Sequence, residues 1–283
     1  MMNKWRNIAL MVSLALFLAG CGKTKEAQAH LAEAKSLYEN QNFEAAKRAI
    51  DTIRINYPRE VAVLRESLVL MRLVERGESE RNIAFCDSLM PIRMAEAEKL
   101  KKGFLFEKDP QYDEIGNYVW QQQTIERNVE RSYVRCGVDE KGEIYLASVY
   151  FGSRPLNHTG LKLSTPDGSY AETIPVAYDG GMNYRFKDGG NTTEVVTYKS
   201  EKCIDAVNFV YGTGDRIRIK AEYTGGTAFS LYLSENDKQA IKATLDLATV
   251  LSDIETMRKE IDKSTKKIMY LDGKLTGSTA ESN

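Results

Sequence analysis

Apolar residues in the first third of the chain recur every three or four positions, which is the spacing of one face of an α-helix. Phe43, Ala46, Ile50 and Ile53 form one such stripe. Turn residues are scarce in this region, and Gly77 stands where a helix is expected to end. The pattern predicts helices over 26–39, 43–55, 58–76 and 79–102, the last with a kink at Pro91.

The pattern changes after residue 104, where short runs of alternating apolar and polar residues follow one another. Between 112 and 232 lie 12 of the 15 tyrosines and 14 of the 20 glycines, a composition typical of strands and turns. No helical spacing separates the runs, so antiparallel pairing is favoured over parallel pairing. Strands are predicted over 129–138, 143–151, 159–164, 169–176, 193–199, 203–211, 216–224 and 227–233.

A helical period returns at Ser234. Ser234 followed by Asp237 is typical of a capped helix start, because a serine can exchange hydrogen bonds with an acidic residue three positions later. An apolar stripe then continues to about Leu271, which at ~1.5 Å per residue makes a helix on the order of 50 Å long. A β-sandwich does not need a helix of that length, so we expect it to pack back along the N-terminal helices.

These elements predict an α+β fold in which the N-terminal hairpins and the long C-terminal helix form a helical stalk that carries an inserted antiparallel β-sandwich. The expected parts are a signal peptide at 1–20, a helical region at 21–104, the sandwich at 105–233, the helix at 234–271 and a disordered tail at 272–283.

The first twenty residues have the pattern of an export signal. Lys4 and Arg6 precede an apolar run from Ile8 to Ala19, which is shorter than the ~20 residues that span a bilayer. The run ends in Leu18-Ala19-Gly20-Cys21, which resembles the lipobox of bacterial lipoproteins. The alternatives are an ordinary secretory signal with a chance cysteine and an uncleaved membrane segment.

The lipoprotein resemblance implies that Cys21 becomes the N-terminus, with a diacylglycerol on its sulfur and an acyl group such as palmitate on its amine. Several acyl chains together would hold the protein firmly on a membrane, whereas a single chain holds only marginally. Residue 22 is Gly rather than Asp, so the resemblance implies the outer membrane without choosing its periplasmic or surface face.

Small, large and aromatic residues followed by a proline recur at a regular spacing in Ala34, Leu37, Phe43, Ala46, Ile50, Ile53 and Pro58. This spacing resembles one tetratricopeptide repeat over 27–60, and a generic helical hairpin is the alternative. The overall layout of the chain also resembles that of uncharacterised lipoproteins of Gram-negative envelopes.

Composition narrows the function classes. The chain of 283 residues carries 39 Lys+Arg and 40 Asp+Glu, so its balanced charge offers no surface for nucleic acid. Its two histidines supply little for a His-rich metal site or a Ser-His triad. No catalytic, metal or cofactor site is predicted.

Three aromatic residues before the first predicted strand, Tyr112, Tyr118 and Trp120, are the candidate ligand-binding residues. Beside the amides of residues 121–123 they could form a flat platform for a sugar. The alternative is that they fill the junction between stalk and sandwich.

Four cysteines are too few for a disulfide scaffold in a chain of this length. Cys136 and Cys203 both fall in predicted strands and could form a disulfide, with free buried thiols as the alternative.

The sequence favours a non-enzymatic interaction or scaffold protein of the cell envelope, held to the membrane by its N-terminal lipid and working with a protein partner. The alternative is a carbohydrate-binding lipoprotein of a glycan-uptake system. An envelope hydrolase is the least favoured hypothesis, because it needs two carboxylates held about 5–10 Å apart and sequence does not reveal such a pair.

Overall fold

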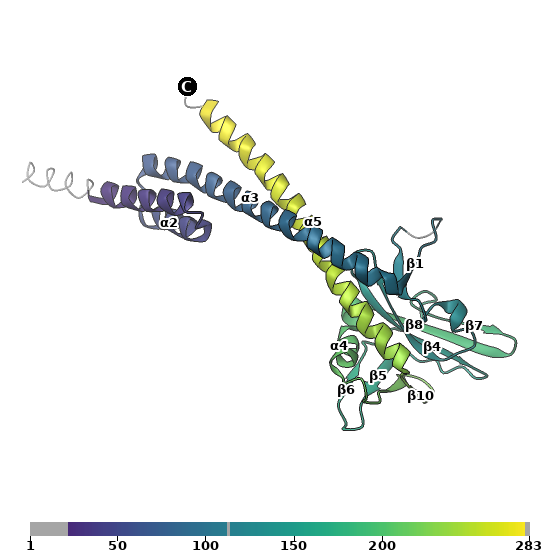
Figure 1. The fold of residues 1–283 in the computed structure, drawn as a ribbon. Helices are drawn as coiled ribbons and strands as arrows, with labels where there is room; N and C mark the ends of the chain where they lie inside the picture. The colour runs from purple at the N-terminus through teal and green to yellow at the C-terminus, as the bar shows by residue number, and fades with distance from the viewer. Residues whose placement is uncertain (1–21, 112–113, 281–283) are drawn as a thin grey trace, which may run out of the picture. The chain divides into compact units, whose positions relative to one another are not determined.

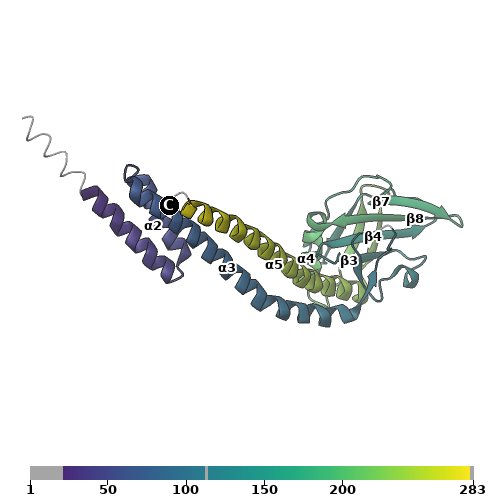
Figure 2. The same cartoon turned by 90° about the horizontal axis from the view of Figure 1, so that it is seen from above.

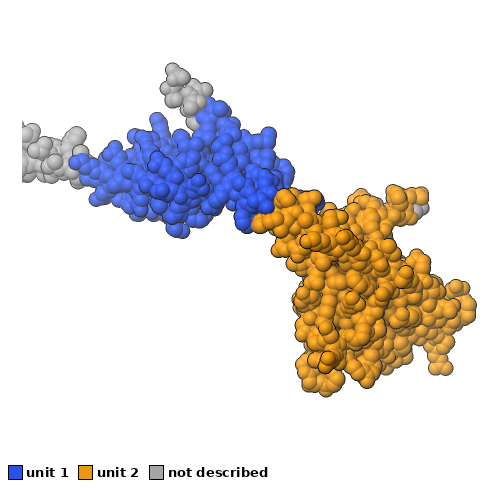
Figure 3. Space-filling view, viewed as in Figure 1, with its two compact units in different colours: residues 1–88, 258–283 blue, residues 89–257 orange. Residues whose placement is uncertain are grey.

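The structure, a computed structural model, describes residues 22–111 and 114–280 (Figures 1 and 2). The chain divides into two compact units (Figure 3). Unit 1 is formed by both ends of the chain, up to Ser88 and from Arg258 onward, and unit 2 by Leu89–Met257. The predicted α+β fold, with N-terminal helices, antiparallel sheets and a long C-terminal helix, is confirmed.

Unit 1 is helical. Residues 22–39 form a helix, which is followed by α2 (Phe43–Asn56) and by the first part of α3 (Val61–Leu100). The side chain of Asn42 caps α2 by accepting a hydrogen bond from the Ala45 amide. The stripe recognised in the sequence is buried, because Phe43, Ala46, Ile50 and Ile53 all belong to the core of this unit with Val63, Leu70 and Val74 of α3.

The prediction that Gly77 ends a helix is wrong, because α3 continues from Val61 to Leu100 and includes both Gly77 and Pro91. The reason is packing. A Cβ atom at Gly77 would lie 2.9 Å from Cε1 of Phe43, so the glycine makes room for the aromatic ring inside the helical core.

The last helix, α5 (Glu235–Ala280), begins as predicted. Ser234 Oγ accepts a hydrogen bond from the Asp237 amide at 3.1 Å, and Asp237 Oδ2 accepts from the Ser234 amide at 2.9 Å. This reciprocal pair satisfies two amides at the helix start.

The prediction of a disordered tail from residue 272 is wrong as far as Ala280, where α5 ends. Gly, Ser and Thr are weak helix formers, but tertiary contacts within unit 1 hold this turn. Leu271 is buried, and Arg76 Nε donates to Asp272 Oδ1 at 2.8 Å. Residues 281–283 lie outside the described residues.

Unit 2 contains two antiparallel sheets. Sheet A has the strand order β1-β2-β3-β4-β8-β7, and sheet B has the order β10-β9-β5-β6. Sheet B packs on one face of sheet A, which we call the inner face. Across this contact the Tyr223 hydroxyl of sheet B donates to the backbone carbonyls of Tyr133 and Val149 in sheet A. The strands are β1 (Phe104–Glu107), β2 (Asn117–Trp120), β3 (Tyr133–Asp139), β4 (Ile144–Gly152), β5 (Gly160–Ser164), β6 (Tyr170–Glu172), β7 (Asn183–Asp188), β8 (Asn191–Lys199), β9 (Lys220–Thr224) and β10 (Phe229–Tyr232).

One predicted strand is a helix. Residues 203–211 were expected to be extended, yet Ile204–Gly212 form α4. Ala206, Val207 and Val210 are its buried residues, and their spacing of one and three positions places them on one helical face. In so short an apolar segment a buried strand and a buried helix have the same pattern, and packing near β6 decides between them.

Candidate functional site

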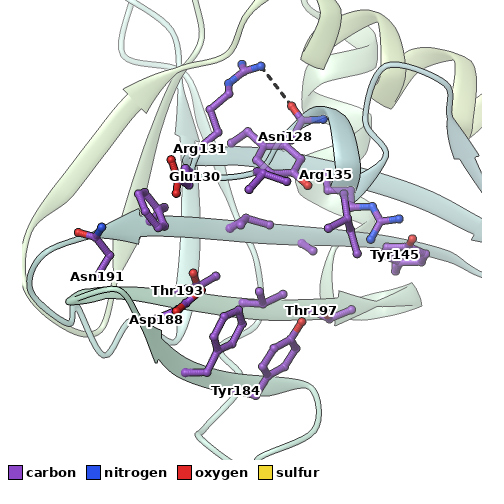
Figure 4. A pocket seen from close by; sticks show the side chains of 18 of the residues that line it. Asn128, Glu130, Arg131, Arg135, Tyr145, Tyr184, Asp188, Asn191, Thr193 and Thr197 are labelled. Atoms are coloured by element: carbon purple, nitrogen blue, oxygen red, sulfur yellow. Dashed lines mark hydrogen bonds between the residues drawn. The ribbon is translucent and has the colours of Figure 1, made fainter.

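The outer face of sheet A carries a groove with a volume of about 540 Å³. Its floor follows β4 and β8, with β3 on one side and β7 on the other. Residues 125–131, the loop before β3 that includes a short 3₁₀ turn (Ile125–Arg127), border it opposite β7 (Figure 4). We call this site the sheet A groove.

The groove is hollow because small side chains alternate with large ones on the outer face. Ala147 of β4 pairs with Thr197 of β8 in the register, so neither fills the centre of the floor. Tyr145 stands at one end of the floor, where its ring lies over Gly137; a Cβ atom at that glycine would be 2.5 Å from the ring carbon that bears the hydroxyl. A side chain at position 137 would therefore displace this ring.

Two aromatic rings form the wall on the β7 side. Tyr184 and Phe186 are two positions apart on this edge strand and therefore point to the same face. Their ring centroids are 6.5 Å apart and their planes differ by 12°. Tyr184 is 37% exposed and Phe186 is 52% exposed, so both rings have surface available for a ligand.

A buried arginine lies at the β3 side of the groove. Arg135 donates from Nη2 to Glu107 Oε2 at 2.6 Å, and its side chain is only 13% exposed. Its Nε is buried and has no hydrogen-bond partner among the described residues. Burial acts to lower the pKa of Arg135, but the neighbouring Tyr145 and Glu107 outweigh it and raise the pKa, so the guanidinium stays charged.

The tyrosine at the end of the floor keeps its proton. Burial raises the pKa of Tyr145 to about 12. At neutral pH its hydroxyl is therefore uncharged and can both donate and accept a hydrogen bond.

Several polar side chains of the groove make no hydrogen bond within the described part of the chain. Thr193 and Thr197 on the floor belong to this group, as do Asp188 and Asn191 at the turn between β7 and β8 (Figure 4). On the opposite border Arg131 donates to Asn128 Oδ1 at 3.1 Å. The site thus combines aromatic walls with donors and acceptors that are open to a ligand, which is the usual make-up of a small-molecule pocket.

The aromatic residues favoured by the sequence do not join this groove. Strand alternation sends Tyr118 and Trp120 of β2 to the inner face of sheet A, opposite to Arg135 and Tyr145. The Trp120 ring packs edge-on against Phe104 with centroids 5.3 Å apart, and Tyr118 packs on Phe106 at 4.9 Å. They form two aromatic pairs on that face and no platform beside the groove. Tyr112 lies outside the described residues.

The three described cysteines form no disulfide. Cys136 and Cys203 are buried and unbonded, as is Cys86 on α3, so the structure contains the free-thiol alternative and not the disulfide. Burial raises the pKa of Cys203 to about 12 and raises that of Cys136 further. Neither thiol forms a reactive thiolate at neutral pH. The predicted lipidation residue, Cys21, lies outside the described residues.

A Ser-His-Glu arrangement that the sequence did not indicate lies between the two sheets of unit 2. Glu194 Oε2 is 2.9 Å from His158 Nδ1, and His158 Nε2 is 2.8 Å from Ser148 Oγ. Because an ionised carboxylate only accepts, Nδ1 carries the proton and Nε2 accepts from the Ser148 hydroxyl. The spacing is that of a catalytic triad.

Burial gives this arrangement a structural role. Ser148 and His158 are 0% and 1% exposed, so no substrate reaches the serine oxygen in this conformation. Glu194 also accepts from the backbone amides of Leu156, Asn157 and His158 at 2.7, 2.9 and 3.3 Å. Through these hydrogen bonds Glu194 holds the loop between β4 and β5 against β8.

Burial also sets the ionisation of this cluster. It lowers the pKa of His158. For Glu194 burial acts to raise the pKa, but the donated amide and imidazole hydrogen bonds outweigh it and lower the pKa. At neutral pH the cluster is therefore a neutral histidine beside a carboxylate.

Within residues 22–111 and 114–280, no group of three His, Cys, Asp or Glu side chains is placed to bind a metal ion. None of the helices in these ranges combines the length and the apolar run that a bilayer crossing requires.

The chain matches no protein-family model, no curated protein and no solved structure. Fold and site geometry define a two-unit α+β protein whose unit 2 bears an aromatic-walled groove.

Proposed function

We propose that this protein is a lipid-anchored module of the cell envelope that binds a ligand without transforming it, and that the sheet A groove is its binding site. The observation that carries the binding proposal is the groove itself. It is concave, it has an exposed aromatic wall, and several of its polar side chains make no hydrogen bond within the described part of the chain.

The anchor part of the proposal rests on the lipobox resemblance at Leu18-Ala19-Gly20-Cys21. Growth with a labelled palmitate analogue tests it, with the Cys21→Ser variant as control. The label should enter the wild-type protein, stay with the outer-membrane fraction, and be absent from the variant. Equal labelling of both proteins would contradict the anchor.

The binding part is tested by crosslinking in intact cells. A photo-crosslinking amino acid is placed at Thr197 on the groove floor and, as a matched control, at Asp167 in the exposed turn between β5 and β6. The groove position should yield a discrete crosslinked species that the control position does not yield. Crosslinking that is equal at both positions, or absent from Thr197, would refute the groove as a binding site.

A further inference from the structure

We propose that the occupant of the sheet A groove is a neutral oligosaccharide. This inference rests on the proposed function, because it names the ligand class for the same groove. The chemistry that would recognise such a ligand is an aromatic face for each apolar side of a sugar ring, surrounded by side chains that pair with its hydroxyls.

The aromatic component is present on the wall and at the end of the floor. Tyr184 and Phe186 present two exposed rings whose planes differ by 12°, and Tyr145 contributes a third ring on the floor. A pyranose has one face made of C–H groups, which pack on an aromatic ring and interact with its negative face. Rings of one orientation suit successive sugars of a chain.

The groove also supplies polar side chains for a polyhydroxylated ligand. Thr193, Thr197, Asp188 and Asn191 line the groove and make no side-chain hydrogen bond within the residues that the structure describes. Arg135 adds a partly exposed guanidinium at the β3 side of the groove.

The charge of the groove favours an uncharged ligand. Arg131, Arg135 and Lys199 bring three positive charges to the lining, and Glu130 and Asp188 bring two negative charges. The third negative charge is that of Glu107, which pairs with Arg135 at 2.6 Å. A polyanion would meet no excess of positive charge here.

The position of the groove disfavours an extended peptide. Peptides that add to a sheet are held by main-chain hydrogen bonds at a free strand edge. The groove lies on the face of the sheet, where the ladders of β3–β4, β4–β8 and β8–β7 already pair the backbone groups of the floor. On the floor of the groove a ligand therefore meets side chains and not free backbone groups.

The test measures saccharide binding by calorimetry. The protein used is the chain from residue 22 onward, which contains both described units. The probes are neutral gluco-, galacto-, manno- and N-acetylglucosamine oligosaccharides, an acidic uronic-acid oligosaccharide, and a polyalanine-based peptide of similar length. We expect at least one neutral oligosaccharide to bind and the other two probes not to bind.

Groove variants decide whether binding occurs where the inference places it. Tyr184→Ala and Phe186→Ala should each weaken binding by about 3- to 10-fold, as expected for the loss of one aromatic contact. The matched control is Tyr170→Ala, because Tyr170 is also an exposed strand tyrosine, 60% exposed, but lies on β6 of sheet B. Unchanged circular dichroism shows that each variant is folded.

The outcomes separate this inference from the proposed function. Binding of a neutral oligosaccharide that Tyr184→Ala weakens and Tyr170→Ala leaves unchanged supports the inference. Binding of the acidic oligosaccharide or the peptide only, binding insensitive to both groove variants, or no saccharide binding at all overturns it. If saccharides fail while Thr197 still yields a crosslink, the binding module stands and its ligand is another molecule. If both fail, the proposed function fails too.

Discussion

Glu194 provides the sharpest stability test of this structure, because one carboxylate holds four donors in the interior of unit 2. Three are the backbone amides of Leu156, Asn157 and His158, and the fourth is Nδ1 of the His158 ring. Glu194→Ala removes all four hydrogen bonds, whereas Glu194→Gln keeps an oxygen that can still accept the first two.

The magnitude follows from the donors left without a partner. Each buried unsatisfied donor costs about 1–3 kcal/mol, so four would cost about 4–12 kcal/mol if nothing relaxed. Water that enters the space left by the side chain lowers this sum, and single substitutions rarely exceed about 5 kcal/mol. We therefore expect Glu194→Ala to lower the free energy of unfolding of unit 2 by about 4 kcal/mol. Glu194→Gln should lower it by about 2 kcal/mol.

Urea unfolding at pH 7 measures both values. In protein produced from residue 22 onward, Trp120 is the only tryptophan, and it lies in unit 2. Its fluorescence therefore reports the unfolding of that unit. The control is Glu222→Ala, since Glu222 is a strand glutamate of sheet B whose side chain is 37% exposed and pairs with Lys220; we expect a loss of less than about 1 kcal/mol.

The reasoning would be refuted if Glu194→Ala were no more destabilising than Glu222→Ala. It would also be refuted if Glu194→Gln were the more harmful of the two substitutions at Glu194, because the retained acceptor would then have no value.

Three further predictions concern other parts of the chain. Burial lowers the pKa of His158, so at pH below about 6.5 this histidine is protonated in the unfolded state before it is protonated in the folded state. The free energy of unfolding of unit 2 should therefore fall by up to about 1.4 kcal/mol for each pH unit below that value. His158→Asn should make the urea midpoint depend less on pH. Gly77→Val should destabilise unit 1 by about 1–3 kcal/mol in far-ultraviolet circular dichroism melts, because its side chain would overlap Phe43; an unchanged melt would contradict the packing explanation. Ser234→Ala removes the cap shared with Asp237 and should cost about 1 kcal/mol in the urea assay, and a stabilised variant would count against the cap.

Local patterns in the sequence were sufficient for much of the fold. The stripe of Phe43, Ile50 and Ile53 predicted the core of unit 1, and Ser234 predicted the start of α5. Predictions failed where tertiary packing overrides a local preference. Gly77 continues a helix because Phe43 needs the space, and residues 204–212 form a helix although their short apolar segment also suits a strand.

Local sequence patterns could not predict the sheet A groove, because the groove depends on the order of the strands in the sheet. Ala147 and Thr197 are far apart in the sequence and become neighbours only because β8 pairs with β4, although β5, β6 and β7 lie between these two strands in the sequence. Alternation shows that Tyr184 and Phe186 share a face, but not which face holds a cavity. Trp120 was selected for its residue type, and register turns it to the other side of sheet A. The buried Ser148–His158–Glu194 cluster likewise depends on β4, β8 and a loop that only the fold brings together.

The division of unit 1 between the two ends of the chain has a consequence for how the protein is made. Arg76 meets Asp272 and Asn82 meets Glu260, contacts that join segments 196 and 178 positions apart. As the chain emerges from the ribosome, the helix of residues 22–39, α2 and the start of α3 precede unit 2, whereas α5 is synthesised last. All the strands of unit 2 are available before that helix is complete. Arg76 and Asn82 therefore lack these hydrogen-bond partners until synthesis has reached the C-terminal half of α5.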